Sequence, residues 1–392
     1  AALVGASTVN WGLKCMNPST CSSGNRTTLT GTAATLISAN PLSGVPATLP
    51  VPMLFDAAGN APFSFSYADV GQVQLVASKL LNGATLSGSS NAFVVKPAGF
   101  SIGSVRQTGG GGTVNPGATS ATGGVFVKAG EAFSAVVTAV TSTGAAAPNF
   151  GRETVPEGVT LSATLLQPAG GVLGSLQNAS VAGGSFTAGV ATLTGLSYGE
   201  VGTISLTPSV ASGSYLGAGN VVGTAVGPIG RFVPAHFVVS GSSLTHRAST
   251  GCSPASSFTY LGENLRVGFT VTAQNAAGAT TTNYSGSWAK LNPAVANAWQ
   301  AVLRDGATVF TTANGRLSVG SASGSFTNGV AAVTLTLAGL RGSAPDGPFV
   351  AGIGVAPVDS DGVALDSFDL ASAAGGAHDR ASVGTAALRF GR

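Results

Sequence analysis

The chain has 392 residues, of which 58 are glycine and 19 are proline, and only 8% are charged. This composition excludes a disordered chain, a coiled coil and a collagen, and it favours an all-β protein with two to four domains. The net charge of +3 comes with no Lys/Arg cluster, so we expect no nucleic-acid partner, and no apolar stretch approaches the ~20 residues of a membrane-spanning helix.

The N-terminal segment 1–11 has no basic region and no complete apolar core, so it is interpreted as a mature or internal start and not as a signal peptide. Cys15 and Cys21 follow in the loop CMNPSTC, and a short disulfide between them indicates an oxidising compartment. The alternative is two free thiols; a zinc site is disfavoured because no second ligand pair follows. Cys252 is left free or pairs with a partner outside this chain.

Strand-like alternation of apolar and polar residues then recurs along the chain, and helical periodicity is nearly absent. The clearest runs are 72–78, 133–140, 203–209, 265–274 and 331–337. Tight turns are predicted where Asn or Asp precedes Gly, at Asn82, Asp305, Asn328 and Asp361. Many short strands with frequent turns indicate β-sandwiches of the immunoglobulin-like type.

Internal repeats divide the chain into modules. FSYADVGQVQLVAS (65–78) matches LSYGEVGTISLTPS (196–209), and GSFTAGVATLTGL (184–196) matches GSFTNGVAAVTLTL (324–337). EAFSAVVTAVTSTGAAAPNF (131–150) likewise matches ENLRVGFTVTAQNAAGATTTNY (263–284). FVVKPAGFSI (93–102) resembles FVPAHFVVS (232–240), and each segment carries a proline where one module passes into the next, Pro97 and Pro234. The prediction is three immunoglobulin-like β-sandwich modules: residues 1–97 (module 1), 98–233 (module 2) and 234–392 (module 3, with a Gly/Ala-rich C-terminal tail).

The predicted linkers are too short and too stiff to behave as random coils. We therefore expect a semi-rigid row of sandwiches on the order of 100 Å long, if each spans roughly 40 Å. Such a row suits mechanical reach better than catalysis.

Several segments, in this order, are similar to one known family. They are 65–78, NAFVVKPAGF (91–100), GRFVPAHFVV (230–239), 252–284, GVAPVDSDGV (354–363) and LRFGR (388–392). The chain resembles the MshQ-like proteins, which are encoded with type IV MSHA-pilus biogenesis components. The resemblance implies a secreted protein of a Gram-negative bacterium, associated with the cell surface or a pilus, with no catalytic residues to carry over. Members of that family usually have further sequence on both sides, which suggests a processed or partial piece.

Catalytic motifs are weak. GFSIG (99–103) fits G-x-S-x-G, but Ser101 lies in an alternating strand with no helix after it, whereas a nucleophile elbow needs one. TGGGG (108–112) lacks the phosphate-loop lysine. His236, His246 and His378 are isolated, so we expect no enzyme.

The C-terminal part is rich in aspartate, and Asp359 and Asp361 have the D-x-D-G spacing of a hard-cation ligand pair. Calcium is one interpretation; a strand–turn–strand hairpin over 355–365 is the other, and no other cofactor is expected.

Three functions follow as hypotheses. The first is an extracellular structural or adhesive protein of a pilus or surface filament, whose partners are other subunits. The second is a carbohydrate-binding module that uses Trp11, Trp288 or Trp299 to contact a surface glycan. The third is a fibre subunit that polymerises with copies of itself by β-strand addition.

Overall fold

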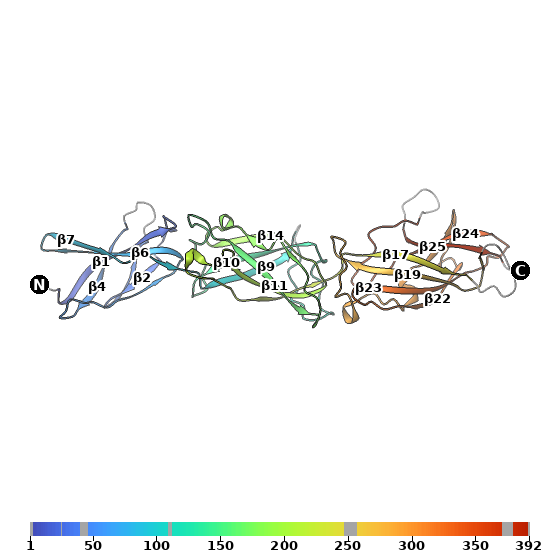
Figure 1. Ribbon diagram of the computed structural model, residues 1–392, viewed down its shortest axis with the longest axis horizontal. Helices are drawn as coiled ribbons and strands as arrows, with labels where there is room; N and C mark the ends of the chain where they lie inside the picture. Colours follow the sequence, from blue (N-terminus) through green and yellow to red (C-terminus); the bar gives the residue numbers. More distant parts are fainter. Residues whose placement is uncertain are drawn as a thin grey trace.

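The computed structural model describes residues 3–24, 26–39, 46–108, 112–246, 257–370 and 379–390. Three β-sandwich modules follow one another in an elongated row, with the two ends of the chain at opposite ends of the row (Figure 1). The described residues form strands and four short 3-10 turns, and no helix among them is long and apolar enough to cross a membrane. The 3-10 turns are η1 (Gly183–Ser185), η2 (Tyr215–Gly217), η3 (Gly286–Trp288) and η4 (Ala296–Trp299). The predicted all-β architecture of tandem sandwiches is confirmed.

Module 1 has one sheet in the order β4-β1-β6-β7, with β8 also paired to β6, and a smaller facing sheet in the order β3-β2-β5. The strands are β1 (Gly5–Asn17), β2 (Thr27–Thr30), β3 (Ala34–Ile37), β4 (Leu49–Phe55), β5 (Ser64–Tyr67), β6 (Gly71–Leu81), β7 (Ala84–Ser89) and β8 (Phe93–Val95).

Module 2 pairs a sheet β12-β14-β10-β9 with a sheet β13-β11-β15-β16. The strands are β9 (Gly99–Gln107), β10 (Ala132–Val140), β11 (Val159–Gln167), β12 (Leu176–Gln177), β13 (Ser180–Val181), β14 (Val190–Tyr198), β15 (Gly202–Val210) and β16 (Val226–Phe232).

Module 3 repeats this arrangement, with sheets β17-β19-β23-β22 and β18-β25-β24-β20-β21. The strands are β17 (His236–Thr245), β18 (Thr259–Tyr260), β19 (Leu265–Gln274), β20 (Val302–Asp305), β21 (Thr308–Phe310), β22 (Leu317–Ser323), β23 (Val330–Gly339), β24 (Phe349–Val355) and β25 (Ala381–Arg389).

The alternation read from the sequence decides which side chains enter the core. Along β10 the buried residues alternate with half-buried ones, and β19 follows the same pattern. Modules 2 and 3 each contain one large core, which includes Phe133 in module 2 and Trp299 in module 3. Module 1 instead has two small clusters, which include Leu13 and Leu29.

The sequence repeats correspond to equivalent strands. The repeat at 65–78 and 196–209 covers β5–β6 and β14–β15, and the repeat at 184–196 and 324–337 covers β14 and β23. The order β4-β1-β6-β8 in module 1 corresponds to β13-β11-β15-β16 in module 2. In the facing sheet, β2 and β5 correspond to β12 and β14, but the described part of module 1 contains no counterparts of β9 and β10.

The chain passes from module to module close to the two prolines. Module 1 ends with β8 at Val95 and module 2 starts with β9 at Gly99; β16 ends at Phe232 and β17 starts at His236. Pro97 and Pro234 lie in these short connections.

The hairpin interpretation of 355–365 is correct for the turn and wrong for both strands, because β24 ends at Val355 and no strand follows the turn. Gly362 has φ +79°, and its N–H donates to the Asp359 carbonyl at 3.1 Å, which closes the turn. The chain after the turn lies beside β17, where the Phe237 N–H donates to the Ala364 carbonyl at 2.8 Å. A tertiary contact with β17 therefore replaces the local strand pairing.

Candidate functional site: the joints between modules

The first joint is organised by a buried carboxylate of module 1. Asp69 lies in the turn between β5 and β6 and is 2% exposed. Its Oδ1 accepts the Val70 N–H at 3.0 Å and, across the boundary, the Asn149 N–H of module 2 at 2.9 Å. Its Oδ2 accepts the Ser22 hydroxyl at 3.0 Å.

Asn149 completes this arrangement from the side of module 2. Its Oδ1 accepts the Ser22 N–H at 2.7 Å, and its Nδ2 donates to the Tyr67 hydroxyl at 2.9 Å and to the Val70 carbonyl at 3.2 Å. Asn149 is fully buried, so water cannot reach its amide group. The hydrogen bonds across the joint therefore take the place of the bonds that the amide would make to water in an exposed position.

The second joint repeats the plan one module further along. Glu200 lies in the turn between β14 and β15, and its Oε1 accepts the Asn283 N–H of module 3 at 3.1 Å. Its Oε2 accepts both the N–H and the hydroxyl of Thr282, at 2.8 and 2.9 Å. Asn283 Nδ2 donates to the carbonyls of Val172 and Val201, both at 2.9 Å, and its Oδ1 accepts the Val172 N–H at 2.8 Å. We call the Asp69–Asn149 and Glu200–Asn283 arrangements the joint clasps.

Local sequence explains why the clasps recur. The acid precedes Val-Gly in both turns, and the glycines have positive φ, +128° at Gly71 and +138° at Gly202. A Cβ on Gly71 would also lie only 2.7 Å from the Asn17 carbonyl oxygen, so glycine is required there. The asparagine stands before an aromatic residue in both partners, Phe150 and Tyr284.

The second joint contains a further element, a buried ion pair. Arg231 of module 2 donates from Nη1 and Nη2 to the two carboxylate oxygens of Asp361 in module 3, both at 2.7 Å. The side chains are 5% and 11% exposed. Arg231 Nε donates to the Gly123 carbonyl at 2.7 Å, which fixes the plane of the guanidinium.

Apolar side chains also cross both boundaries. Val70 of module 1 packs into the core of module 2, and Val201, Val233 and Ala121 of module 2 pack into the core of module 3. The hydrogen-bonded groups are thus enclosed by apolar contacts, and water cannot easily replace them.

Burial raises the pKa of the Asp69 carboxyl, and the hydrogen bonds from Asn149, Val70 and Ser22 oppose that rise. Burial also raises the pKa of Tyr67, and the nearby Asp69 raises it further. Within module 3 burial raises the pKa of Asp359, whose Oδ2 accepts the Tyr284 hydroxyl at 2.7 Å.

Cys15 and Cys21 form a disulfide, and the loop that it closes lies at the first joint. Asn17 in this loop accepts the Thr154 N–H of module 2 at 2.7 Å through its Oδ1. Ser22, directly after the second cysteine, contacts Asn149 as described above. The bridge therefore shapes a contact surface that its sequence did not reveal. Cys252 lies outside the described residues.

Asp359 and Asp361 are close to each other, and each carboxylate is hydrogen-bonded to other groups of the protein. Asp359 Oδ1 accepts the N–H groups of Asp361 and Val363 at 2.8 and 2.9 Å, and Asp361 holds Arg231. The described residues contain no cluster of three or more His, Cys, Asp or Glu that could hold a metal ion. Both carboxylates therefore have structural partners within the protein, and calcium binding at this pair stays a prediction.

The other serine, tryptophan and histidine candidates lie apart from one another. Ser101 lies in strand β9, and Trp288 and Trp299 are buried, at 7% and 0% exposure. His236 contacts Gln274 at 3.2 Å and His246 contacts Thr259 at 3.0 Å. His378 lies outside the described residues.

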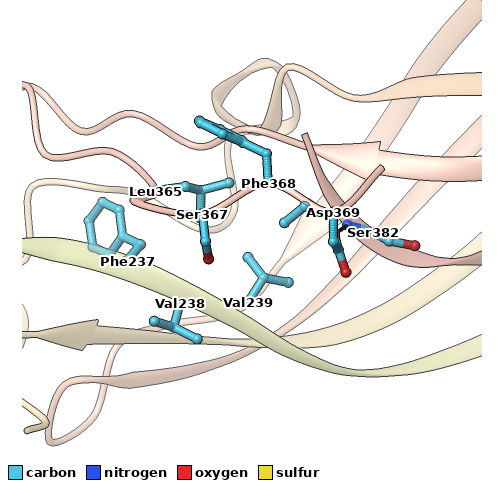
Figure 2. Close-up of a pocket in the computed structure, with 9 residues that line it drawn as sticks. Phe237, Val238, Val239, Leu365, Ser367, Phe368, Asp369 and Ser382 are labelled. Atoms are coloured by element: carbon cyan, nitrogen blue, oxygen red, sulfur yellow. Dashed lines mark hydrogen bonds between the residues drawn. The ribbon is translucent and has the colours of Figure 1, made fainter. Parts of the chain in front are cut away.

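One cavity of module 3 is lined mainly by apolar side chains. Figure 2 shows this cavity of about 130 Å³ between β17 and the segment that leads into β25, lined by Phe237, Val238, Val239, Leu365 and Phe368. Among its lining residues Asp369 is the ionisable one, and its carboxylate accepts the Ser382 N–H.

Sequence reasoning missed Asp69, Asn149, Glu200, Asn283 and Arg231. The signal was present in the repeats, where an acid before Val-Gly and an asparagine before an aromatic residue both recur. The contacts between these residues could not be predicted from the sequence, because each contact joins residues of two different modules.

Comparison with known proteins assigns the modules to one family. Residues 1–89 match the first Ig-like domain of the domain of unknown function DUF6701, residues 96–194 match its second domain and residues 200–385 match its third. The comparison with curated proteins gives no match. Among solved structures, the crystal structure of "Putative membrane anchored protein from Corynebacterium diphtheriae" is 11% identical, covers 99% of this chain and 83% of that chain, and has a TM-score of 0.19.

Proposed function

The chain belongs to the DUF6701 family, and from that premise we propose that it is an extracellular structural or adhesive protein of a pilus or surface filament. In this proposal the three modules act as one stiff spacer that carries a contact surface away from the cell, and they catalyse no reaction. The resemblance to MshQ-like proteins supports the association with a pilus.

The observation that carries the proposal is the repetition of the joint clasp. Each clasp buries a carboxylate and an asparagine from opposite modules, and their hydrogen bonds need both modules in one orientation. A different orientation that kept the modules in contact would leave these groups buried without partners, at a cost of about 1–3 kcal/mol for each group. The joints therefore favour a single extended arrangement, as in Figure 1.

Two further features support an extracellular location. The Cys15–Cys21 disulfide is typical of an oxidising compartment. The low charge, 8% of residues, reduces the electrostatic repulsion between copies and suits a protein that works in an assembly.

Small-angle X-ray scattering tests the mechanical part of this proposal. We expect a pair-distance distribution of a rod with a maximum dimension on the order of 100 Å or more, because stacked sandwiches with short strands add their lengths. A compact particle, or a scattering curve that requires freely swivelling modules, would contradict it.

The adhesive part is tested in the producing bacterium. Deletion of the gene should reduce surface attachment, and the intact gene should restore it. A gene encoding the Asn149→Ala and Asn283→Ala substitutions should not restore attachment.

The carbohydrate-binding hypothesis has less support. Stacking on a sugar needs an exposed aromatic face, whereas Trp288 and Trp299 are buried and the Trp11 ring packs on Phe63 with centroids 4.6 Å apart.

A further inference from the structure

A groove of about 840 Å³ lies on module 3. One wall is formed by η4 and the start of β20, and the other by the turn after β21 and the first residues of β22. Strands β21 and β22 stand last in their two sheets, so the groove lies where the two layers of the sandwich end. The residues that line it all belong to module 3, and none of them is a joint residue described above.

The wall at η4 is formed by a segment that is longer in module 3 than in module 2. In module 2 residues 151–158 join Phe150 to β11, whereas in module 3 residues 285–301 join the equivalent Tyr284 to β20. The longer segment contains η3 and η4. Connections carry binding residues more often than the scaffold that they join, so this segment is a candidate binding surface.

This segment is anchored by Trp299, which is fully buried. The Trp299 Nε1–H donates to the Pro293 carbonyl at 3.2 Å, and the Trp299 carbonyl accepts the Ala356 N–H at 2.9 Å. Its ring packs edge-on against Phe269, with centroids 5.0 Å apart. The wall is therefore preorganised, which reduces the entropy lost when a ligand binds.

Gln300 follows Trp299 in a left-handed conformation, with φ +45° and ψ +45°. Glycine adopts this conformation at lower cost, and strained residues concentrate at binding sites. The Gln300 carbonyl accepts the Arg380 Nε–H at 3.0 Å, which holds the backbone in place. Its exposed side chain lines the groove and makes no hydrogen bond to the described residues, so a primary amide is free there.

Arg380 is the ionisable residue among those that line the groove. Its Nε and Nη1 donate to the carbonyls of Gln300 and Asp379, at 3.0 and 2.7 Å, which fixes the plane of the guanidinium. Its Nη2 makes no hydrogen bond to the described residues, and the side chain is 21% exposed. The Asp379 carboxylate lies 3.4 Å from both Arg380 and Arg304, so one half-exposed acid serves two cations and positive charge is left over.

The other polar groups of the groove are uncharged. Asn297, Thr312 and Ser318 have exposed side chains that make no hydrogen bond to the described residues. Amide groups provide donors and acceptors, and a hydroxyl is both at once, as are the hydroxyls of a sugar. Among the described residues that line the groove none is acidic, so an anionic ligand meets no repulsion there.

We propose that this groove binds a segment of an acidic polysaccharide. The Arg380 guanidinium contacts a sugar carboxylate, since its planar N–H groups match carboxylate geometry. The amides of Asn297 and Gln300 and the hydroxyls of Thr312 and Ser318 contact sugar hydroxyls. This mode differs from stacking on a tryptophan and requires none of the three tryptophan rings.

The inference deepens the adhesive part of the proposed function and rests on it for the setting in which the ligand is met. Without an aromatic ring to stack on the sugar, the hydrogen bonds compete with water, so we expect a Kd on the order of 1 mM for one groove. Several copies in one filament would bind a polysaccharide at several points, which raises the overall strength of attachment.

An acidic oligosaccharide provides a direct test. Tetragalacturonate is titrated into the intact 392-residue protein, and NMR correlation spectra follow its N–H groups. We expect saturable shifts of the Gln300 N–H and the Trp299 indole N–H. The matched control is the fully methyl-esterified tetrasaccharide, which keeps its ring hydroxyls but has no charge, so its affinity should fall about tenfold.

Two protein variants test the groove residues. Arg380→Gln removes the cation and should lower the affinity about tenfold. Gln300→Gly removes the amide and should lower the affinity about threefold without loss of thermal stability, because glycine adopts the left-handed conformation freely. The matched control is Ala188→Gly, at φ +51° in an exposed turn of module 2, which should leave the affinity unchanged.

Three outcomes would overturn the proposal: no saturable shift at the groove, equal affinity for the acid and its ester, or equal affinity of the Gln300→Gly and Ala188→Gly variants. Tighter binding of tetraglutamate than of tetragalacturonate would also overturn it, because the groove would then suit an acidic peptide. A rod-shaped protein without binding would refute the groove alone, whereas a binding groove in a protein whose deletion leaves attachment intact would refute the adhesive function alone.

Discussion

The joint between modules 1 and 2 and the joint between modules 2 and 3 are built on the same clasp but differ in what surrounds it. In the first, Asp69 and Asn149 are accompanied by contacts from the disulfide loop. In the second, Glu200 and Asn283 are accompanied by the buried pair of Arg231 and Asp361. The apolar contacts differ as well. Across the second joint, Ala121, Val201 and Val233 of module 2 are buried in the core of module 3, whereas across the first joint Val70 of module 1 is buried in the core of module 2.

This difference indicates that the orientation of the modules and the resistance of a joint to opening depend on different contacts. The hydrogen bonds of the clasps define the orientation of adjacent modules, because they are directional and buried. Among the described residues, the buried ion pair adds resistance to opening at the second joint, and the second joint also has the larger set of buried apolar contacts. We therefore expect the first joint to open before the second when the chain is bent, heated or denatured.

The largest effect is expected from Arg231→Met. It leaves the Asp361 carboxylate buried without its cation, so the second joint should lose about 3–5 kcal/mol, as measured by urea unfolding of modules 2 and 3. The double variant with Asp361→Ala should be less destabilised than the single one. Equal losses would mean that the two side chains do not act as a pair.

Removal of the clasp asparagines should come next. Asn283→Ala and Asn149→Ala each strip partners from several buried backbone groups, so we expect a loss of about 2–4 kcal/mol at the affected joint. Scattering and fluorescence energy transfer between labelled modules should report a bent or swivelling joint. Asn91→Ala, at an exposed site beside the first linker, is the control. An unchanged rod in both clasp variants would show that the apolar contacts alone set the orientation.

Opening the disulfide should have a smaller effect, confined to module 1 and the first joint. For a loop with a sequence separation of 6, the entropic stabilisation is about 2 kcal/mol. Differential scanning calorimetry of Cys15→Ser/Cys21→Ser should show an earlier transition for module 1 and unchanged transitions for the other modules. A simultaneous shift of module 3 would contradict the separation of the joints.

The smallest expected effect is a dependence of the first joint on pH. Burial raises the folded-state pKa of Asp69 above 3.8, so the stability that the protonated carboxyl contributes is present below that value and is lost as the pH rises through the folded-state pKa. Asp69→Asn should remove this dependence, which chemical denaturation between about pH 3 and 7 can detect by the difference between the two proteins. Parallel pH profiles for the two proteins would exclude Asp69 as the responsible group.

The modules also differ from one another in their described strands. Modules 2 and 3 complete both sheets with strands from the described chain, whereas module 1 completes one. Its two small cores follow from this, because the facing sheet cannot cover the whole of β4-β1-β6-β7.

Much of the fold was predictable because it depends on local patterns. Alternation placed β10 and β19, Asn-Gly placed the turns at Asn82 and Asn328, and the repeats identified equivalent strands. The burial of Trp288 was also expected from its alternating context. The prediction failed where a distant segment competed with a local one, as after Asp361, where β17 replaced a hairpin partner.

The sequence by itself determined the β class, the modular repetition and the short, proline-containing connections, since side-chain alternation, turn residues and prolines act within a few residues of chain. Only the tertiary structure decided which polar groups meet, because Asp69 and Asn149 lie 80 residues apart and Arg231 and Asp361 lie 130 residues apart. A buried charge or amide is stable only beside the partner that replaces its water, and the packing of whole modules brings that partner into place.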